Sequence, residues 1–310
     1  MIERVDVHQH LWPEPLLAAL ARRSRPPLLR RSAGRWVLRI AGEPEWPVDP
    51  RDHDPVRRAS LVARDGLDRA VVALSSPLGI EALPAAEAEE LLAAYHAGAA
   101  TLGDRLSAWA SAGLARPDPS ALADRLDEGF VGLCLPAGAL CDPEGAARCA
   151  PLLSTLEERG SPLLVHPGPA PWSAPPSTGQ GSPGWWPALT SYVAQIHAAW
   201  LAFGAWVRPA HPRLRACFAM LAGLAPLHTE RLASRGVERD ADDPALFFDT
   251  SSYGPRAIAA VAAVVGRDRL VYGSDRPVID PVRPAFGDPV LDPGDPGAAR
   301  LLLAPQEVLA

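Results

Sequence analysis

Short runs of apolar residues recur along the chain, and they predict buried β-strands. The runs cover residues 4–8, 69–74, 106–110, 130–135, 162–166, 214–219, 246–250 and 269–273. Several contain almost no polar residue, which is typical of parallel strands that are covered on both faces. The pattern therefore predicts a parallel sheet of eight strands.

Amphipathic or Ala-rich segments separate most of these runs and predict helices at 84–101, 143–159, 187–203, 226–235 and 255–265. Each begins with Pro, and four are followed directly by Gly, which is the usual polarity of helix ends. Strands that alternate with helices in this way predict an α/β fold, a single (β/α)8 TIM barrel over residues 1–310. The alternative is an open doubly wound sheet, but no GxGxxG motif follows the first strand.

Two segments interrupt the alternation. Residues 24–54 contain the alternating stretch Arg-Trp-Val-Leu-Arg-Ile and several Pro and Gly, which predicts a small hairpin inserted after the first strand. The loop 167–187 carries Trp172, Trp185 and Trp186, and its length predicts a lid or a wall of a substrate pocket. We place Trp12 in the same predicted pocket because it follows the first strand closely.

Composition excludes several classes of protein. The chain has 310 residues, is 48% hydrophobic and carries a net charge of −6 without a basic run, so a nucleic-acid partner is not expected. No apolar stretch is long enough to span a membrane, and the charged start MIERVDVHQH does not resemble a signal peptide. The four Cys residues lack CxxC spacing, which predicts reduced thiols in a cytoplasmic protein.

Four polar side chains end predicted strands and form a candidate metal site. His8 and His10 lie two residues apart and so face the same side of the first strand, His166 ends the strand 162–166, and Asp275 follows the strand 269–273. Active sites of parallel barrels lie at the carboxyl ends of the strands. Three imidazoles and a carboxylate suit one divalent ion, Zn²⁺ by preference with Mn²⁺ as the alternative.

The chain resembles the amidohydrolase superfamily, in the branch that includes aminocarboxymuconate-semialdehyde decarboxylase and the resorcylate decarboxylases. The blocks VDVHQHLWP, PLLVHPGPAP, HPRLRACFA, FFDTSSYGP and RLVYGSDRP carry the resemblance, in family order. It implies a single divalent metal held by His8, His10, His166 and Asp275. The chain contains no Lys, so a carbamylated Lys bridging two metals is excluded.

One departure from the family concerns proton transfer. The family carries a His at the end of strand six, where this sequence reads Cys217-Phe218-Ala219-Met220. A thioether cannot carry a proton at neutral pH. If Met220 takes the place of that His, proton transfer relies on Asp275, on another His such as His197 or His228, or on the substrate.

These observations predict a metal-dependent hydrolase that cleaves an amide, ester or lactone bond of a small molecule, with Asp275 as the catalytic base. The alternatives are non-oxidative decarboxylation of a small aromatic or unsaturated acid and a barrel that binds a ligand without turnover. Arg276 is expected to form a salt bridge at the barrel rim, with binding of a substrate carboxylate as the alternative, and an exposed turn is expected for His53. Barrels of this kind often pair, which leaves a homodimer open.

Overall fold

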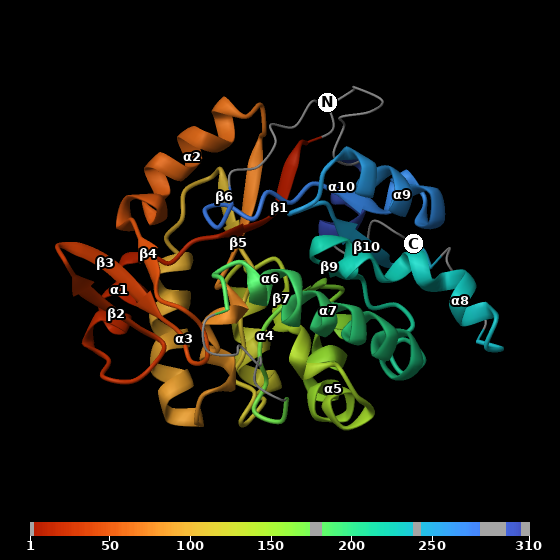
Figure 1. Cartoon of the computed structure of the whole chain (residues 1–310), viewed down its shortest axis with the longest axis horizontal. Coiled ribbons are helices and arrows are strands. Elements are labelled where there is room, and N and C mark those ends of the chain that lie inside the picture. Colours follow the sequence, from red (N-terminus) through yellow and green to blue (C-terminus); the bar gives the residue numbers. More distant parts are fainter. Residues whose placement is uncertain (1–2, 174–181, 238–242, 280–295, 305–310) are drawn as a thin grey trace.

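The computed structural model describes residues 3–173, 182–237, 243–279 and 296–304, and its centre is a set of parallel strands (Figure 1). One sheet has the order β1-β5-β6 and the other the order β11-β10-β9-β8-β7. Each of the eight predicted runs overlaps one strand: β1 (Val5–His10), β5 (Arg69–Ala73), β6 (Leu106–Ala108), β7 (Leu133–Pro136), β8 (Leu163–His166), β9 (Ala216–Phe218), β10 (Leu246–Asp249) and β11 (Leu270–Val271).

The two parallel sheets do not form one continuous ladder among the described residues. Backbone hydrogen bonds join them at both seams, from Val7 N to Tyr272 O over 2.9 Å and from Cys134 N to Ala110 O over 2.9 Å. The structure thus confirms the parallel α/β arrangement of the predicted barrel, but not its closure into a complete ring.

Helices follow most strands, as the sequence predicts. They are α1 (Glu14–Arg22), α2 (Pro55–Arg64), α3 (Ala85–Ala99), α4 (Pro119–Asp127), α5 (Pro143–Glu158), α6 (Trp186–Leu189), α7 (Ser191–Ala202), α8 (Thr229–Ala233), α9 (Pro255–Val265) and α10 (Pro296–Leu303). The segment predicted as one helix over 187–203 is divided at Thr190, whose ψ of −80° departs from helical geometry. The predicted helix 226–235 is shorter, because its first residues form a tight turn instead.

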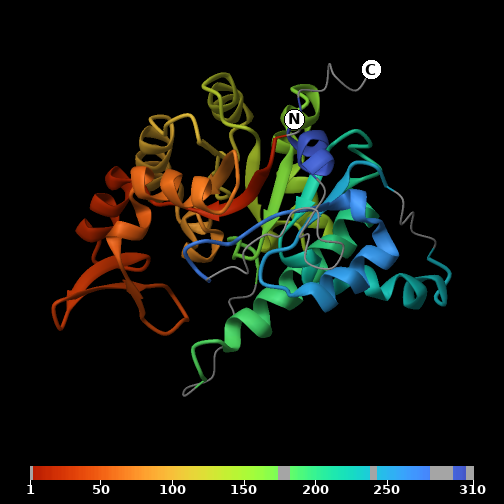
Figure 2. The same cartoon turned by 90° about the horizontal axis from the view of Figure 1, so that it is seen from above.

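The insertion after β1 is a small antiparallel sheet. Strand β3 (Arg35–Arg39) pairs with β2 (Leu28–Ser32) on one side and with β4 (Trp46–Val48) on the other, so a third strand joins the expected hairpin. A short 3-10 helix, Pro50–His53, then leads into α2. Seen from above, this sheet and the segment around α6 project on the same side of the barrel (Figure 2).

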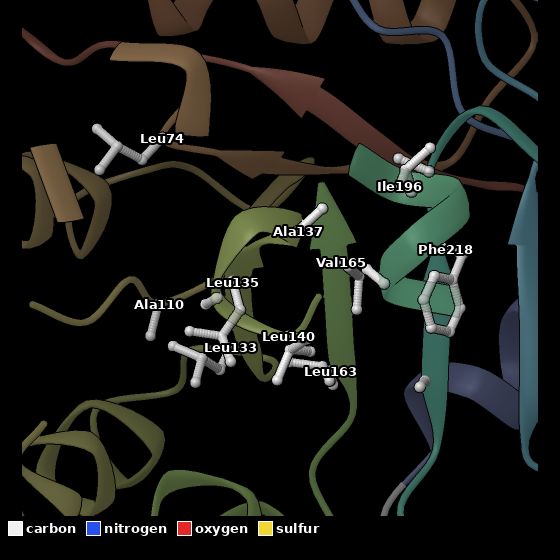
Figure 3. Packing of buried hydrophobic residues seen from close by; sticks show 14 of the residues in the cluster. Leu74, Ala110, Leu133, Leu135, Ala137, Leu140, Leu163, Val165, Ile196 and Phe218 are labelled. Carbon is white, nitrogen blue, oxygen red and sulfur yellow. The ribbon is translucent and has the colours of Figure 1, made fainter. Parts of the chain in front are cut away.

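Apolar residues on the two faces of the strands form two separate cores. Val7, Ala73, Leu164 and Phe247 belong to the smaller core, to which α10 also contributes, whereas the larger core lies between strands and helices. In Figure 3, the larger core includes Val165 of β8 beside α7. Leu164 and His166 are two residues apart on β8, so His166 continues the row of the smaller core. The carboxyl ends of the strands therefore present polar side chains above an apolar interior.

A β-bulge in β1 changes which residues face the interior. The register of β1 against β5 shifts between Asp6 and Gln9. Val7 packs in the smaller core, and the next residue, His8, meets the other imidazoles of the site. Bulges commonly re-aim side chains beside active sites. Because of this irregularity, the side chains of Val7 and of the two histidines can lie on the same side of the strand.

The four Cys residues are unpaired, as predicted. Among the described residues, no helix combines the length and apolarity needed to cross a membrane.

Candidate metal site and adjoining cavity

Three imidazoles and one carboxylate converge at the carboxyl ends of the strands. His8 and His10 come from β1, His166 from β8 and Asp275 from the loop after β11; one potential ligand atom from each lies within 4.8 Å of the others. The three rings are nearly perpendicular to one another, at 86°, 82° and 88°, with centroids 4.8–4.9 Å apart. The rings thus surround a common point in the way that three ligands of one ion do.

Hydrogen bonds to the outer nitrogens fix two of these rings. Nδ1 of His8 donates to Oδ2 of Asp249 over 2.8 Å, and Nδ1 of His166 donates to the carbonyl of Pro167 over 2.8 Å. Each bond leaves Nε2 free to bind a metal, which is the usual arrangement around metal-bound histidines. The sequence analysis did not include Asp249, although its position at the end of β10 is the same signal that identified His166.

Asp275 is held in an unusual backbone conformation. Its φ is 58°, in the left-handed region, which carries a steric cost for residues other than Gly. Its backbone N donates to the carbonyl of His8 over 2.9 Å, and the preceding Ser274 N donates to Oδ1 of the buried Asp6 over 3.1 Å. The loop after β11 is therefore tied to β1, and this brings Asp275 to the histidines.

The charges in this site are balanced by close pairing. Although burial disfavours its charged form, His8 has its pKa raised to about 9 by Asp249, Asp275 and Asp6. Burial lowers the pKa of both His10 and His166. Burial also disfavours ionisation of Asp275, but the neighbouring imidazoles keep its pKa below the ordinary value. These shifts favour an anionic Asp275 beside neutral imidazoles at His10 and His166, whereas His8 favours its protonated form.

The arrangement fits a divalent cation. Nε2 of His8 lies 3.2 Å from Nε2 of His10, and Oδ1 of Asp275 lies 3.1 Å from Nε2 of His10. Oδ1 is buried and lacks a hydrogen-bond partner of suitable geometry among the described residues. A cation between these atoms would bind the lone pairs of the imidazole nitrogens and of the carboxylate oxygen, which are buried away from water and face one another. His8, His10, His166 and Asp275 therefore form a candidate divalent-metal site.

A cavity of about 260 Å³, here called the His10 cavity, adjoins this site. Its walls come from the inserted sheet, the 3-10 helix Pro50–His53, the loop after β5 and the start of α7. Most of the lining is apolar, including Trp12, Leu38, Ile40, Trp46, Val48 and Leu78. The volume is close to the lower end of the range of roughly 300–1,000 Å³ usual for small-molecule sites.

The predicted aromatic residues separate into two groups. Trp12 lines the His10 cavity, whereas Trp172, Trp185 and Trp186 are not among its described lining residues. Trp172 lies under the guanidinium of Arg148, 5.3 Å from ring centroid to Cζ, and Trp185 and Trp186 are exposed to solvent. The loop 167–187, of which residues 174–181 lie outside the described part, contributes Gly184 and Pro187 to the cavity instead. The prediction that at least one of these three indoles contacts the pocket is thus not met among the described lining residues, because their rings pack against α5 or face solvent.

Arg276 forms the expected salt bridge rather than lining the cavity, whereas His53 differs from its predicted environment. The guanidinium of Arg276 pairs with Asp65 at 2.8 Å, and Arg276 is not among the described residues that line the His10 cavity. The pairing accounts for this position, since Asp65 is itself nearly buried. His53, expected in an exposed turn, is buried and lines the cavity. That prediction was wrong because the inserted sheet covers the turn.

Met220 lies behind the site rather than on the cavity wall. Its backbone N donates to Oδ1 of Asp249 over 3.2 Å, and its side chain belongs to the larger core. It begins a turn in which φ stays between 49° and 64° as far as Leu224. Gly223 is needed within this turn, since a Cβ there would lie 2.9 Å from the carbonyl of Val193. The strained turn is stabilised by packing against α7.

The other proposed proton carriers are not among the described residues that line the His10 cavity. His197 and His228 lie beside each other, with ring centroids 5.0 Å apart, and neither is among the described lining residues. His228 is exposed, and His197 is half-buried on α7. Of the residues proposed to carry a proton, Asp275 is therefore the one that lies beside the imidazoles of the candidate metal site.

The family of the chain follows from comparison with known proteins. A family model described as amidohydrolase matches residues 5–296, so the chain belongs to the amidohydrolase family. Among curated proteins, none matches this chain.

Solved structures of similar fold include decarboxylases. The 5-carboxyvanillate decarboxylase of Sphingomonas paucimobilis has a TM-score of 0.70 at 15% identity, covering 98% of this chain and 100% of that chain. The 2,6-dihydroxybenzoate decarboxylase of Rhizobium has a TM-score of 0.64 at 17% identity, covering 97% and 99%. A 5-carboxyvanillate decarboxylase of Novosphingobium aromaticivorans, complexed with manganese and a nitrobenzoic acid, has a TM-score of 0.64 at 16% identity, covering 89% and 86%. At these identities the likeness supports the fold.

Proposed function

We propose that the chain is a metal-dependent, non-oxidative decarboxylase of a small aromatic or unsaturated carboxylic acid. The observation that carries this proposal is the contact between the apolar His10 cavity and the candidate metal site, through His10 itself. An apolar cavity with a few polar groups at one end suits a flat ring that carries a polar substituent. The decarboxylases of similar fold, one of them complexed with manganese, support the same reaction.

The residues of the site have distinct roles in this proposal. His8, His10, His166 and Asp275 would hold the ion, which supplies attraction for the substrate carboxylate when bound. Asp249 fixes the orientation of His8, and the aromatic and aliphatic walls of the cavity exclude water from the ring. Zn²⁺ and Mn²⁺ both remain candidates, because both accept imidazole and carboxylate ligands.

The reaction replaces a C–CO₂⁻ bond with a C–H bond, so it consumes one proton and releases CO₂. Asp275 lies beside the imidazoles, and the carboxylate oxygen that does not hold the ion would carry a proton to the substrate carbon. Met220 cannot take part in this transfer because it has no titratable group.

Hydrolysis of an amide, ester or lactone is the second candidate function. It is favoured by the lowered pKa of Asp275, since an ionised carboxylate is better suited to accept a proton from water than to donate one. Hydrolysis needs no proton on carbon, so the substitution by Met220 affects it less.

The two functions are separated by assaying the metal-loaded protein, with Zn²⁺ or Mn²⁺, against hydroxybenzoic acids, lactones and aryl amides. Metal-dependent release of CO₂ that is lost in Asp275→Asn would support the proposal. Metal-dependent hydrolysis without CO₂ release would replace it with the second candidate. Tight binding without turnover of any compound would favour a ligand-binding barrel instead.

A further inference from the structure

His53 is a buried imidazole in the same cavity as His10, and the metal site does not use it. It ends the 3-10 helix Pro50–His53 and is only 4% exposed. Its ring stacks on the indole of Trp12, with centroids 4.3 Å apart and planes at 14°. The stacking fixes the plane of the imidazole beside the ligand-bearing end of β1.

A backbone hydrogen bond determines which nitrogen of His53 carries a hydrogen. The N–H of Trp12 donates to Nδ1 over 3.0 Å. Because a backbone N–H can only donate, Nδ1 must offer its lone pair, and the neutral ring carries its hydrogen on Nε2. Within the described part of the chain, the hydrogen bond of this imidazole is made at Nδ1, which leaves Nε2–H available to a ligand.

The surroundings keep this ring neutral. Burial, together with the charge of Arg58, lowers the pKa of His53 to about 3. Arg58 also fixes the position of the ring, because its guanidinium donates to the carbonyl of His10 over 3.0 Å and to the carbonyl of Asp52. A neutral imidazole held in one tautomer is a hydrogen-bond donor for an uncharged or weakly charged oxygen.

The charged residues of the His10 cavity are carboxylates. Glu43, Asp49 and Asp52 line it, and its described lining residues include no Arg. Asp49 and Asp52 pair with Arg51 and Arg57 at the partly exposed rim. Glu43 accepts a hydrogen bond from the hydroxyl of Tyr192, deeper in the cavity. No cationic side chain among the described lining residues would therefore pair with a second carboxylate on a substrate whose first carboxylate is held at the metal, so burying that second charge would be unfavourable.

We propose that His53 is a specificity-determining residue whose Nε2–H binds an uncharged oxygen of the substrate, such as a phenol or carbonyl oxygen. The His10 cavity then selects monocarboxylic acids that carry such an oxygen over dicarboxylic acids. The proposal rests on the proposed function for the placement of the first carboxylate.

The first test is the tautomer of His53 in the metal-loaded full-length protein. Long-range ¹H–¹⁵N correlation spectra after ¹⁵N-histidine labelling should show a hydrogen on Nε2, with no titration between about pH 5 and 8. His53→Asn and His53→Gln assign the signals by their absence. A hydrogen on Nδ1, or a ring that titrates in this range, would overturn the proposal.

The second test compares the affinities of matched ligands by calorimetry. The probes are the three monohydroxybenzoates and the three benzenedicarboxylates with substituents at the same ring positions. We expect at least one hydroxybenzoate to bind about tenfold more tightly than its dicarboxylate counterpart. Equal affinities in all three pairs, or no binding by any hydroxybenzoate, would contradict the selection.

Two variants separate the donor from the shape of the residue. In His53→Gln, the side-chain amide places an N–H donor near the position of Nε2. In His53→Asn, the shorter amide can still accept the hydrogen bond from the N–H of Trp12 but has no donor at the position of Nε2. We expect His53→Asn to weaken hydroxybenzoate binding about tenfold and His53→Gln to weaken it less, with thermal unfolding as the check on folding. Equal binding by wild type and His53→Asn refutes the role of His53. Intact selectivity without CO₂ release would refute only the proposed decarboxylation.

Discussion

Asp249 and His8 form a hydrogen-bonded pair over 2.8 Å with both side chains fully buried. The same carboxylate accepts hydrogen bonds from the backbone N of Met220 and of Ser251, so it joins β10 to the turn after β9 and to the metal site. Although burial disfavours its ionisation, His8 together with the hydroxyl and the backbone N of Ser251 keeps the pKa of Asp249 below the ordinary value. This residue therefore positions a ligand without belonging to the ligand set.

Substituting Asp249 by Asn is expected to weaken metal binding by about 10- to 100-fold, because the neutral amide no longer fixes the tautomer and orientation of His8. Competition with a chelator measures the affinity. Asp268→Asn, a change at an exposed side chain, is the matched control and should leave the affinity unchanged. If Asp249→Asn folds normally and binds metal as tightly as wild type, Asp249 has no such positioning role.

The candidate metal site predicts about one divalent ion per chain. Elemental analysis of protein incubated with Zn²⁺ or Mn²⁺ and then freed of excess metal gives the stoichiometry. His166→Ala removes one of the four ligands and should lower the metal content well below that of wild type. His228→Ala changes an exposed imidazole outside the site and serves as the control. A wild-type content near zero after incubation would eliminate the metal site.

The sequence predicted the strands and the cluster of candidate metal ligands well because both depend on local pattern. Apolar runs marked every parallel strand, and the i, i+2 spacing of His8 and His10 placed both on one side of β1. Asp249 was missed although it also ends a strand, since nothing in the sequence states that it faces His8 across the sheet. The β-bulge in β1 has no local signal either, because it depends on pairing with β5.

Loop residues were harder to place, since their environment depends on which segments pack over them. The burial of His53 follows from the inserted sheet and from Trp12, a residue 41 positions earlier in the chain. Trp185 and Trp186 carry the same aromatic character as Trp12 but remain exposed, so residue type alone does not identify a cavity wall. A salt bridge was expected for Arg276, but its partner Asp65, just after α2, is not predicted by any spacing rule.

A buried carboxyl away from the metal site makes stability depend on pH. Glu81 is buried and accepts hydrogen bonds from the hydroxyls of Ser76 and Ser111 over 3.0 and 3.1 Å. Burial raises its pKa from 4.5 to about 7. The folded state thus keeps the proton longer than the unfolded state, so the stabilisation is complete below about pH 4.5 and is lost as the pH rises through about 7.

Replacing Glu81 by Gln should remove this dependence, because the amide stays neutral and still accepts from both hydroxyls. The free energy of unfolding of Glu81→Gln relative to wild type should rise by roughly 2–3 kcal/mol between pH 5 and 8. Urea denaturation at both pH values measures the difference. Glu89→Gln, at an exposed position of α3, is the control and should show little change. A difference that is independent of pH would mean that Glu81 is ionised in the folded protein throughout.

The position of Met220 permits a test of the proton-transfer argument. Its φ of 55° lies in the left-handed region, where His is found more often than most other residues. The hydrogen bonds from Met220 to Asp249 and Ser251 are donated by its backbone N, so they do not depend on the side chain. Met220→His should therefore fold with the turn intact. A histidine here would add a titratable group behind the metal site, and a well-placed acid or base typically contributes about 10²–10⁴ in rate.

We expect unmodified protein to decarboxylate hydroxybenzoic acids slowly and Met220→His to be faster, by up to about a hundredfold if the new imidazole reaches the substrate. Met220→Leu keeps a similar volume without a titratable group, so it should match wild type. The pH dependence of kcat should gain an ionisation near the usual pKa of His in the His variant alone. Rapid decarboxylation by the unmodified protein, with no gain in Met220→His, would show that proton transfer does not depend on this position. Asp275, or the substrate itself, would then have to supply the proton.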